Sequence, residues 1–251
     1  MTLKLSKLNE MMKYIIMAWF LAVAMTLRGI GFNIFIAILA AFALTVLGYM
    51  LCVYNMYLQT NRMRKLNERM NEKKCMDGYL ETMEKIGRRT IWANVFYQTL
   101  LNRGTGYINL GEYKKALEIM DELEKYTVPV EIRFFEIWNR IFACIELRRY
   151  GQVEKLMKKY QKILDHYAEA SESIADRLEL YRYIAAGDTQ MALEMIRTCR
   201  EKGAEEDQNV IDQLDYYEIR LCQLSGDHER AEELKQHLRS HPVFPCIAQI
   251  L

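Results

Sequence analysis

The stretch 110–117 reads LGEYKKAL, and its spacing of Gly111 and Ala116 recurs along the chain. Segment 186–193 reads AGDTQMAL, and segment 225–232 reads SGDHERAE. Each copy follows one apolar pattern of helical period and precedes another. A glycine ends a helix in a left-handed turn, an acidic residue suits the start of the next helix, and a small residue lets the two helices pack closely. The stretch therefore predicts a helix–turn–helix unit that repeats.

A degenerate copy at 148–153 reads RRYGQV and lacks a glycine at the usual turn position. The anchors Ala116, Val153, Ala192 and Ala231 follow one another at intervals of 37, 39 and 39 residues. Because one helix pair cannot bury its apolar faces alone, neighbouring pairs are expected to stack. Only 3 Pro and 12 Gly occur in 251 residues, which favours helix throughout. We therefore expect an all-α chain.

These repeats resemble the tetratricopeptide repeat family. The best copy spans 100–129, and Pro129 falls close to the terminal proline of the family. Six residues match the large, small, aromatic, turn, aromatic and small positions of that family: Leu100, Gly104, Tyr107, Gly111, Tyr113 and Ala116. The observed spacing exceeds the family repeat of about 34 residues, so longer loops are expected. The resemblance covers roughly 90–242 and implies an α-solenoid of such repeats at 89–251; a generic α-solenoid is the alternative.

In that family the first helix of each unit lines a concave groove. The resemblance places these residues in the groove: Gln98, Leu101, Thr105, Asn109, Phe135, Trp138, Phe142, Glu146, Arg177, Tyr181, Ile184, Tyr216, Arg220 and Gln223. Aromatic residues and arginine are typical binding anchors. The predicted partner-binding residues are therefore Trp138, Phe142, Arg177, Tyr181, Tyr216 and Arg220, with a protein or peptide as partner. For Trp138 and Phe142, packing between helices is the alternative. The basic carboxylate clamp of the family is not reproduced.

Two apolar runs precede the repeats, at 14–27 and 34–57. A membrane span needs about 17–25 residues. The second run is long enough and carries no charge, whereas the first reaches this length only if it extends over 11–30 with its flanking bases at the interface. The short connection favours antiparallel neighbours. We predict a two-helix transmembrane hairpin within 1–57; a cleaved signal peptide is disfavoured because a second span follows at once.

Small residues recur at intervals of four in both runs: Ala18 and Ala22 in the first, and Ala37, Ala41 and Thr45 in the second. This spacing lets two membrane helices approach closely. Alanine is also common in membrane spans, which is the alternative explanation. With either explanation, the short connection favours antiparallel neighbours.

Basic residues flank both ends of the hairpin. Lys4, Lys7 and Lys13 precede the first run, and the predicted linker at 58–88 opens with a basic helix. The excess of positive charge predicts an integral membrane protein of the plasma membrane with both termini in the cytoplasm. The predicted lipid-contacting residues are Arg62, Arg64, Lys65 and Arg69, which suit anionic head groups. A role in setting topology alone is the alternative.

Composition and motifs narrow the function classes. The net charge is +1, and the part after residue 57 is slightly acidic, which argues against nucleic acid as the main ligand. Six cysteines occur without a CxxC pair, and a cytoplasmic domain keeps them reduced. No P-loop, GxSxG or HExxH motif is found. We therefore expect neither an enzyme nor a cofactor. A metal site of Glu233, His237 and His241, which share one helix face, is a minor alternative.

The tail at 242–251 is apolar. We expect it to fold back over the last helix pair, with a docking peptide for another protein as the alternative. Two functions follow from the whole pattern. The first is a membrane-anchored adaptor that presents a helical-repeat groove at the cytoplasmic face. The second is a small subunit of a membrane complex, such as transport or secretion machinery, whose hairpin is functional and whose repeats serve assembly.

Overall fold

The computed structural model describes residues 3–202 and 208–251, with side chains from Tyr14 onward except Ile15. Within these ranges the chain is helical and contains no strand, which confirms the all-α prediction. The helices are α1 (Leu3–Gly29), α2 (Ile34–Lys73), α3 (Tyr79–Arg89), α4 (Ala93–Asn109), α5 (Tyr113–Glu124), α6 (Val130–Glu146), α7 (Tyr150–Lys159), α8 (Gln161–Ala170), α9 (Glu172–Ala186), α10 (Thr189–Lys202), α11 (Gln208–Ser225), α12 (His228–Arg239) and α13 (Pro245–Ala248).

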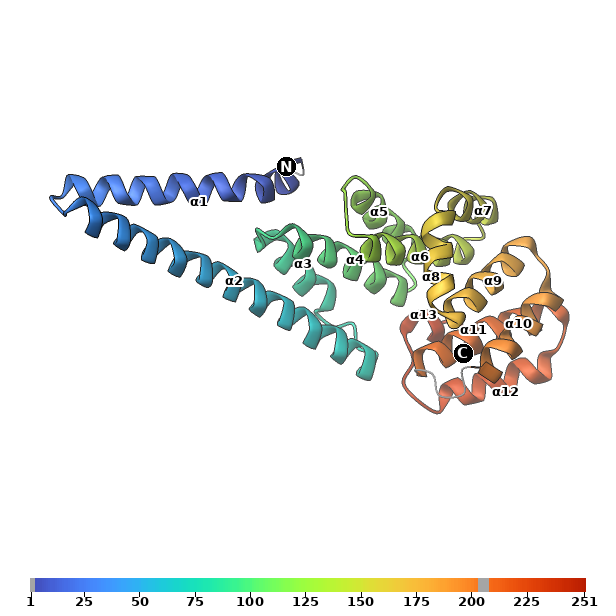
Figure 1. Ribbon diagram of the computed structural model, residues 1–251. Helices are drawn as coiled ribbons and strands as arrows, with labels where there is room; N and C mark the ends of the chain where they lie inside the picture. The colour runs from blue at the N-terminus through green and yellow to red at the C-terminus, as the bar shows by residue number, and fades with distance from the viewer. Residues whose placement is uncertain (1–2, 203–207) are drawn as a thin grey trace.

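The helices from α4 to α12 form an array of antiparallel pairs (Figure 1). The pairs are α4 with α5, α6 with α7, α9 with α10, and α11 with α12. The repeat anchors Ala116, Val153, Ala192 and Ala231 are all buried. A Cβ atom at Gly104 would lie 1.8 Å from Met120 Cε, so the small residue allows the close approach of α4 and α5. The predicted helix–turn–helix repeats are thus present.

The four turns between the helices of each pair have the same backbone conformation. Gly111, Gly187 and Gly226 have φ angles of 78°, 75° and 83°. In the degenerate copy Arg148 adopts this left-handed conformation with φ 55°. The backbone N–H of Arg148 donates to Ile145 O at 2.9 Å, as Gly111 does to Ile108 O at 2.8 Å. The second unit therefore keeps the turn although it lacks the glycine.

A short helix separates the second and third pairs. The chain bends at Tyr160, whose backbone N–H donates to Leu156 O, and α8 then packs on α9 and α6. Phe134 of α6 stacks on Tyr167 of α8 with ring centroids 4.0 Å apart. This extra helix lies within the interval of 39 residues between Val153 and Ala192.

Helix α2 is continuous over 40 residues and joins the apolar region to the array. Its last part, residues 58–73, is here called the stem. The stem buries Met63 and Met70, and Tyr79 Oη donates to Asn67 Oδ1 at 2.7 Å. The next helix is α3, which buries Tyr79, Met83 and Ile86. The stem is therefore packed on the array, and no break in α2 marks the predicted boundary at residue 57.

Helices α1 and α2 lie side by side and run antiparallel, joined by a turn at Gly31 (Figure 1). Asn33 caps α2, because its side chain accepts a hydrogen bond from Phe35 N at 2.9 Å. Among the described residues, α2 is the one helix that is long and apolar enough to cross a membrane. The apolar part of α1, Ile16–Gly29, is shorter. A helical hairpin is thus present, but the first membrane span is not shown. The predicted flanking residues Lys4, Lys7 and Lys13 lie outside the described side chains.

The small residues of the two apolar helices differ in their surroundings. Ala37 and Ala41 of α2 are buried, and Thr45 is half-buried. Ala18 and Ala22 of α1 are exposed, so they do not supply the close approach that their spacing would allow. The rotation of α1 turns another side toward α2. Of the small residues in this pattern, the buried ones therefore belong to α2.

Candidate functional site: the groove inside the helical array

Helix α6 supplies the central wall of the groove. Trp138, Phe142 and Glu146 are four residues apart, which places them on one face of this helix. Phe142 is buried and lies edge-on to Tyr217 of α11, with ring centroids 6.0 Å apart. Because α6 belongs to the second pair and α11 to the fourth, this contact crosses the inside of the array. The groove is consequently narrow at its centre.

Helix α9 contributes a cation and an aromatic ring beside this wall. The Arg177 guanidinium lies over the Trp138 ring, 4.8 Å from its centroid. Arg177 Nη2 also donates to Gln213 Oε1 of α11 at 2.6 Å. Tyr181 lies edge-on to Trp138 with centroids 5.3 Å apart. Three helices of three different pairs are joined here by aromatic and polar contacts.

A buried ion pair closes the far end of the α6 face. Arg220 Nη1 lies 2.7 Å from both carboxylate oxygens of Glu146. Tyr216 Oη donates to Glu146 Oε2 at 2.5 Å. The Glu146 side chain is 4 % exposed and the Arg220 side chain is 24 % exposed. Since a buried charge needs both a partner and hydrogen bonds, these three residues fix how α6 and α11 meet.

Burial controls protonation in this cluster. It raises the pKa of Glu146, and the Arg220 charge and the Tyr216 hydrogen bond only partly oppose this increase. Burial and the nearby Glu146 charge raise the pKa of Tyr216. Burial, with a smaller contribution from Glu146, also raises the pKa of the Cys246 thiol to about 12. Tyr216 and Cys246 are therefore neutral at physiological pH.

The C-terminal tail, residues 242–251, occupies the remaining space between α4, α6 and α11. Phe244, Cys246 and Ile247 are buried, and α13 packs on both α4 and α11. Gln249 Nε2 donates to Leu110 O at 3.4 Å, across 139 residues of sequence. The tail was expected to cover the last helix pair. It does contact that pair, and it also extends to the first pair, because the array curves enough to bring α4 and α11 together.

The structure brings all six predicted partner-binding residues to the inside of the array. Phe142, Tyr181 and Tyr216 are buried, with Tyr181 only 1 % exposed. Trp138, Arg177 and Arg220 are half-buried. Phe142 packs between helices, which is the alternative that the sequence left open for it. Binding of a partner by the six residues stays a prediction.

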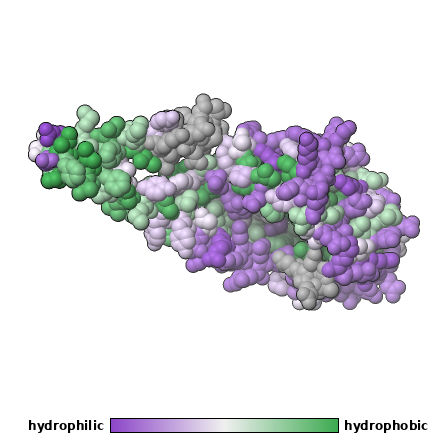
Figure 2. Space-filling view, in the orientation of Figure 1, coloured by the Kyte–Doolittle hydropathy of each residue, from purple (hydrophilic) through white to green (hydrophobic). Residues whose placement is uncertain are grey.

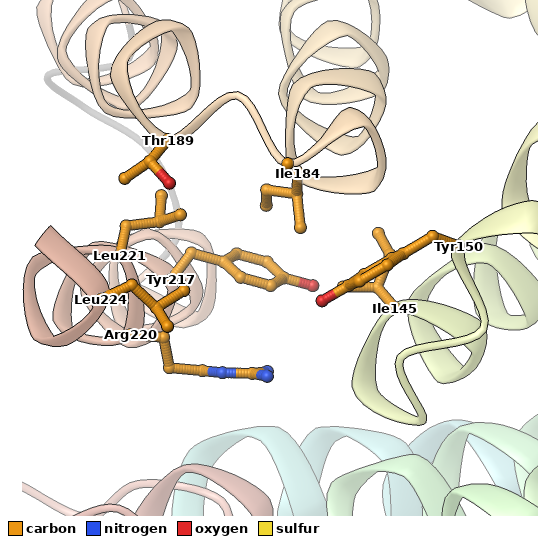
Figure 3. A pocket seen from close by; sticks show the side chains of 9 residues that line it. Ile145, Tyr150, Ile184, Thr189, Tyr217, Arg220, Leu221 and Leu224 are labelled. Atoms are coloured by element: carbon orange, nitrogen blue, oxygen red, sulfur yellow. The ribbon is translucent and has the colours of Figure 1, made fainter.

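A small cleft lies on the other side of Arg220, between α6, α9 and α11. Ile145, Ile184, Leu221 and Leu224 give it apolar walls. Tyr217 and Tyr150 point their hydroxyl groups toward each other across it (Figure 3). Its volume is about 130 Å³, whereas sites for small molecules and cofactors measure about 300–1,000 Å³. The cleft suits a single side chain of a partner rather than a cofactor.

The predicted lipid-contacting residues Arg62, Arg64, Lys65 and Arg69 are all exposed on the stem. The opposite side of the stem carries Met63 and Met70 and packs on the array. The basic face therefore remains free for solvent or for lipid head groups.

The predicted metal alternative is not assembled. Glu233 pairs with Arg230 at 3.1 Å. His237 Nδ1 lies 2.7 Å from Asp215 Oδ2, and His241 Nε2 lies 2.8 Å from Asp212 Oδ1. Over residues 3–202 and 208–251 no group of His, Cys, Asp and Glu side chains could hold a metal ion. The two histidines pair with the buried carboxylates of α11 instead.

Sequence reasoning missed three contributors to the groove. Cys246 and Ile247 come from the tail, whose Pro245 at the first position of a helix signals that α13 begins there. Lys74, at the end of α2, places Nζ 4.5 Å from the centroid of the Phe244 ring and bonds to Asn209. No local signal predicts the Lys74 contacts, because they join segments 135 or more residues apart.

No protein-family model matches the chain, and no curated protein matches it significantly. Among solved structures, one described as "MamA RS-1 ArsTM double mutant" is similar, with 15 % identity over 71 % of this chain and 91 % of that chain. The TM-score is 0.40. A similarity of this size supports no inference about family or function. The array of helix pairs and the contents of its groove therefore carry the functional argument.

Proposed function

We propose that the chain is a membrane-anchored adaptor whose hairpin inserts into the plasma membrane and whose array binds a protein or peptide at the cytoplasmic face. The continuity of α2 supports this proposal most directly. One helix carries an unburied apolar half and a stem that is packed on the array through Met63 and Met70. The anchor therefore sets the position of the groove relative to the membrane.

The apolar half of α2 is mostly uncovered by protein, because only 11 % of its most apolar 18-residue stretch is buried. Figure 2 shows hydrophobic surface gathered over α1 and α2, while the array is mostly hydrophilic. Phe35, Leu39 and Phe42 are among the large exposed side chains. Exposed apolar patches of this extent mark membrane or protein contacts. A buried core helix of a water-soluble domain does not fit this pattern.

A second function is a subunit of a membrane complex whose hairpin is the functional part. The exposed apolar side chains on both helices, such as Leu21 of α1 and Leu47 of α2, favour it, since they could pack on other spans. In this case the array would serve assembly. The two functions differ in which part of the chain retains the partner.

Replacement of residues 1–57 by an unrelated two-span hairpin separates the two functions. This change keeps the stem, which α3 and α4 need for burial. Affinity capture after crosslinking in cells is then compared with that of the wild type. The adaptor function predicts the same partner at similar yield. Loss of the partner from a folded, membrane-inserted chimera supports the subunit function and contradicts the adaptor.

A paired substitution tests the groove itself. Trp138→Ala with Arg177→Ala removes two half-buried side chains and leaves Tyr181 and Tyr216 in place. We expect at least a tenfold loss of captured partner. Val130→Ala, on an exposed part of the same helix, is the matched control and should retain it. Equal capture by both variants would show that the partner binds elsewhere.

A further inference from the structure

The contacts of the C-terminal tail have the features of a bound peptide. The tail begins at the end of α12, crosses to α11 and ends one short helix later at α4. It inserts three side chains, Phe244, Cys246 and Ile247, into the groove. Ile108, Phe142 and Tyr216 line the adjoining cavity from α4, α6 and α11. One local segment therefore contacts the first and fourth helix pairs and shares a cavity with Phe142 of the second pair.

Polar groups fix the direction of the tail in the groove. Gln249 Nε2 donates to Leu110 O at the first turn. The guanidinium of Arg239 donates to the carbonyl oxygen of Leu251. At the other end Lys74 lies over the Phe244 ring. The tail thus presents to the groove an aromatic residue and one apolar turn that begins at Pro245.

The tail also contacts the end of the membrane helix. Lys74 follows α2 directly and has a left-handed conformation, with φ 51°. Its side chain touches Asn209 of α11 and Phe244 of the tail. The same residue therefore joins the stem, the fourth pair and the tail. Lys74 follows the end of the stem that is farthest from the apolar half of α2, so the tail contacts the stem at that end.

We propose that the groove between α4, α6 and α11 is the docking surface, that the tail is its resident ligand, and that a partner binds by displacing it. The displacing segment has the chemistry of the tail: an aromatic residue, then proline, then an apolar helical turn. This inference rests on the proposed adaptor function and specifies its ligand. In the resting chain the partner site is occupied.

Alkylation of cysteines in the purified full-length chain tests the displacement. Cys246 reports on the tail, because it is 6 % exposed when docked and its thiol is poorly ionised there. Cys144, Cys199 and Cys222 are buried in the array and report on global unfolding. Cys75 is half-buried outside the groove and serves as the accessible reference. Peptide mass spectrometry resolves the rate at each site.

We expect Cys246 to react at least tenfold faster than the three array cysteines, because the tail leaves the groove without unfolding. A synthetic peptide with the sequence of residues 242–251 and serine in place of cysteine is the probe. At saturation it should raise the Cys246 rate at least threefold and leave the array cysteines unchanged. The Phe244→Ala, Ile247→Ala double variant should bring Cys246 to the rate of Cys75, whereas Ala248→Ser should not.

Reaction of Cys246 in step with the three array cysteines would overturn the proposal, since the tail would then be a permanent part of the core. A Cys246 rate that the peptide does not change would overturn it as well. Neither result depends on a partner. A failure here is therefore distinguishable from a failure of the hairpin replacement, which measures partner retention in cells.

Discussion

At the scale of single residues, the turn of the second unit shows how the repeat tolerates change. Arg148 adopts the left-handed conformation that glycine adopts in the other three turns. The turn persists because its backbone hydrogen bonds are the same, including Arg149 N to Cys144 O at 2.8 Å. A non-glycine residue in this conformation carries a cost of about 1–2 kcal/mol.

Arg148→Gly should therefore stabilise the chain by up to about 1 kcal/mol, since it removes this cost although it adds freedom to the unfolded chain. The matched change is Gly226→Ala, where no atom lies within 4 Å of an added Cβ and φ is 83°. It should destabilise by about 1 kcal/mol through the backbone alone. Urea denaturation in detergent measures both. A destabilised Arg148→Gly variant would contradict this account of the turn.

The buried pair of Glu146 and Arg220 gives a second prediction at this scale. Arg220→Met leaves a buried carboxylate without its partner, which costs about 3 kcal/mol at pH 8. Burial already raises the pKa of Glu146, and loss of Arg220 raises it further. The folded state then binds the proton more tightly than the unfolded state, so stability falls as the pH rises above the ordinary glutamate range.

The measurement is urea denaturation of Arg220→Met at pH 5 and pH 8. The variant should recover part of its lost stability at pH 5, where Glu146 takes up a proton. The Glu146→Gln, Arg220→Met double variant is the control and should lose this extra pH dependence. If the single and double variants respond alike to pH, Glu146 is not the titrating group.

At the scale of elements, α2 combines an apolar half and an amphipathic stem in one continuous helix. Its apolar half is uncovered, and its stem has one face of methionines on the array and one face of bases in solvent. The amphipathic sequence of the stem predicts this division. The rotation of α1 about its own axis could not be predicted in the same way. Alanines that suit a helix contact occur on more than one side of α1, and sequence spacing alone does not decide which side faces α2.

Packing of the stem predicts a loss of stability when its methionines are shortened. Met63→Ala and Met70→Ala should each destabilise the array by about 2 kcal/mol or more, as other buried methionines do. Leu58→Ala is the control, since this side chain is 46 % exposed on the same helix. Denaturation followed by tryptophan fluorescence gives the comparison. Equal effects at all three positions would contradict the packing of the stem.

The basic face of the stem predicts a graded contact with anionic lipid. At 1.5 Å per residue, Arg62 lies about 8 Å beyond Tyr57 along the helix and Arg69 about 18 Å. The Debye length at physiological salt is about 8 Å. The Arg62→Gln, Arg64→Gln, Lys65→Gln variant should therefore lose more than half of its crosslinking to a photoactivatable anionic lipid, and Arg69→Gln little. Unchanged crosslinking in the triple variant would contradict the lipid contact. These bases would then act only in setting the topology.

At the scale of the whole molecule, sequence predicted the local units better than their assembly. The helices, the turns and the anchors follow from period, glycine and small residues, because these features act within about 40 residues, the length of one repeat. The curvature that brings Glu146 to Arg220 depends on the sum of many packing angles. The place of the tail depends on that curvature, so the contents of the groove could not be predicted from the sequence.

The central claim is that two helices cross the membrane and leave the array on the cytoplasmic side, and labelling in intact cells tests it most directly. An epitope ahead of Met1 reports on the amino terminus, Gly29→Cys on the connection and native Cys75 on the segment that follows the stem. Gly29 accepts this change because no atom lies within 4 Å of an added Cβ.

A membrane-impermeant maleimide should label Gly29→Cys in intact cells, whereas Cys75 and the epitope should become accessible only after permeabilisation. An epitope accessible in intact cells together with Gly29→Cys would reduce the hairpin to a single span. Labelling of Cys75 and Gly29→Cys from the same side would contradict the account, because the array would then have no membrane span between it and the connection.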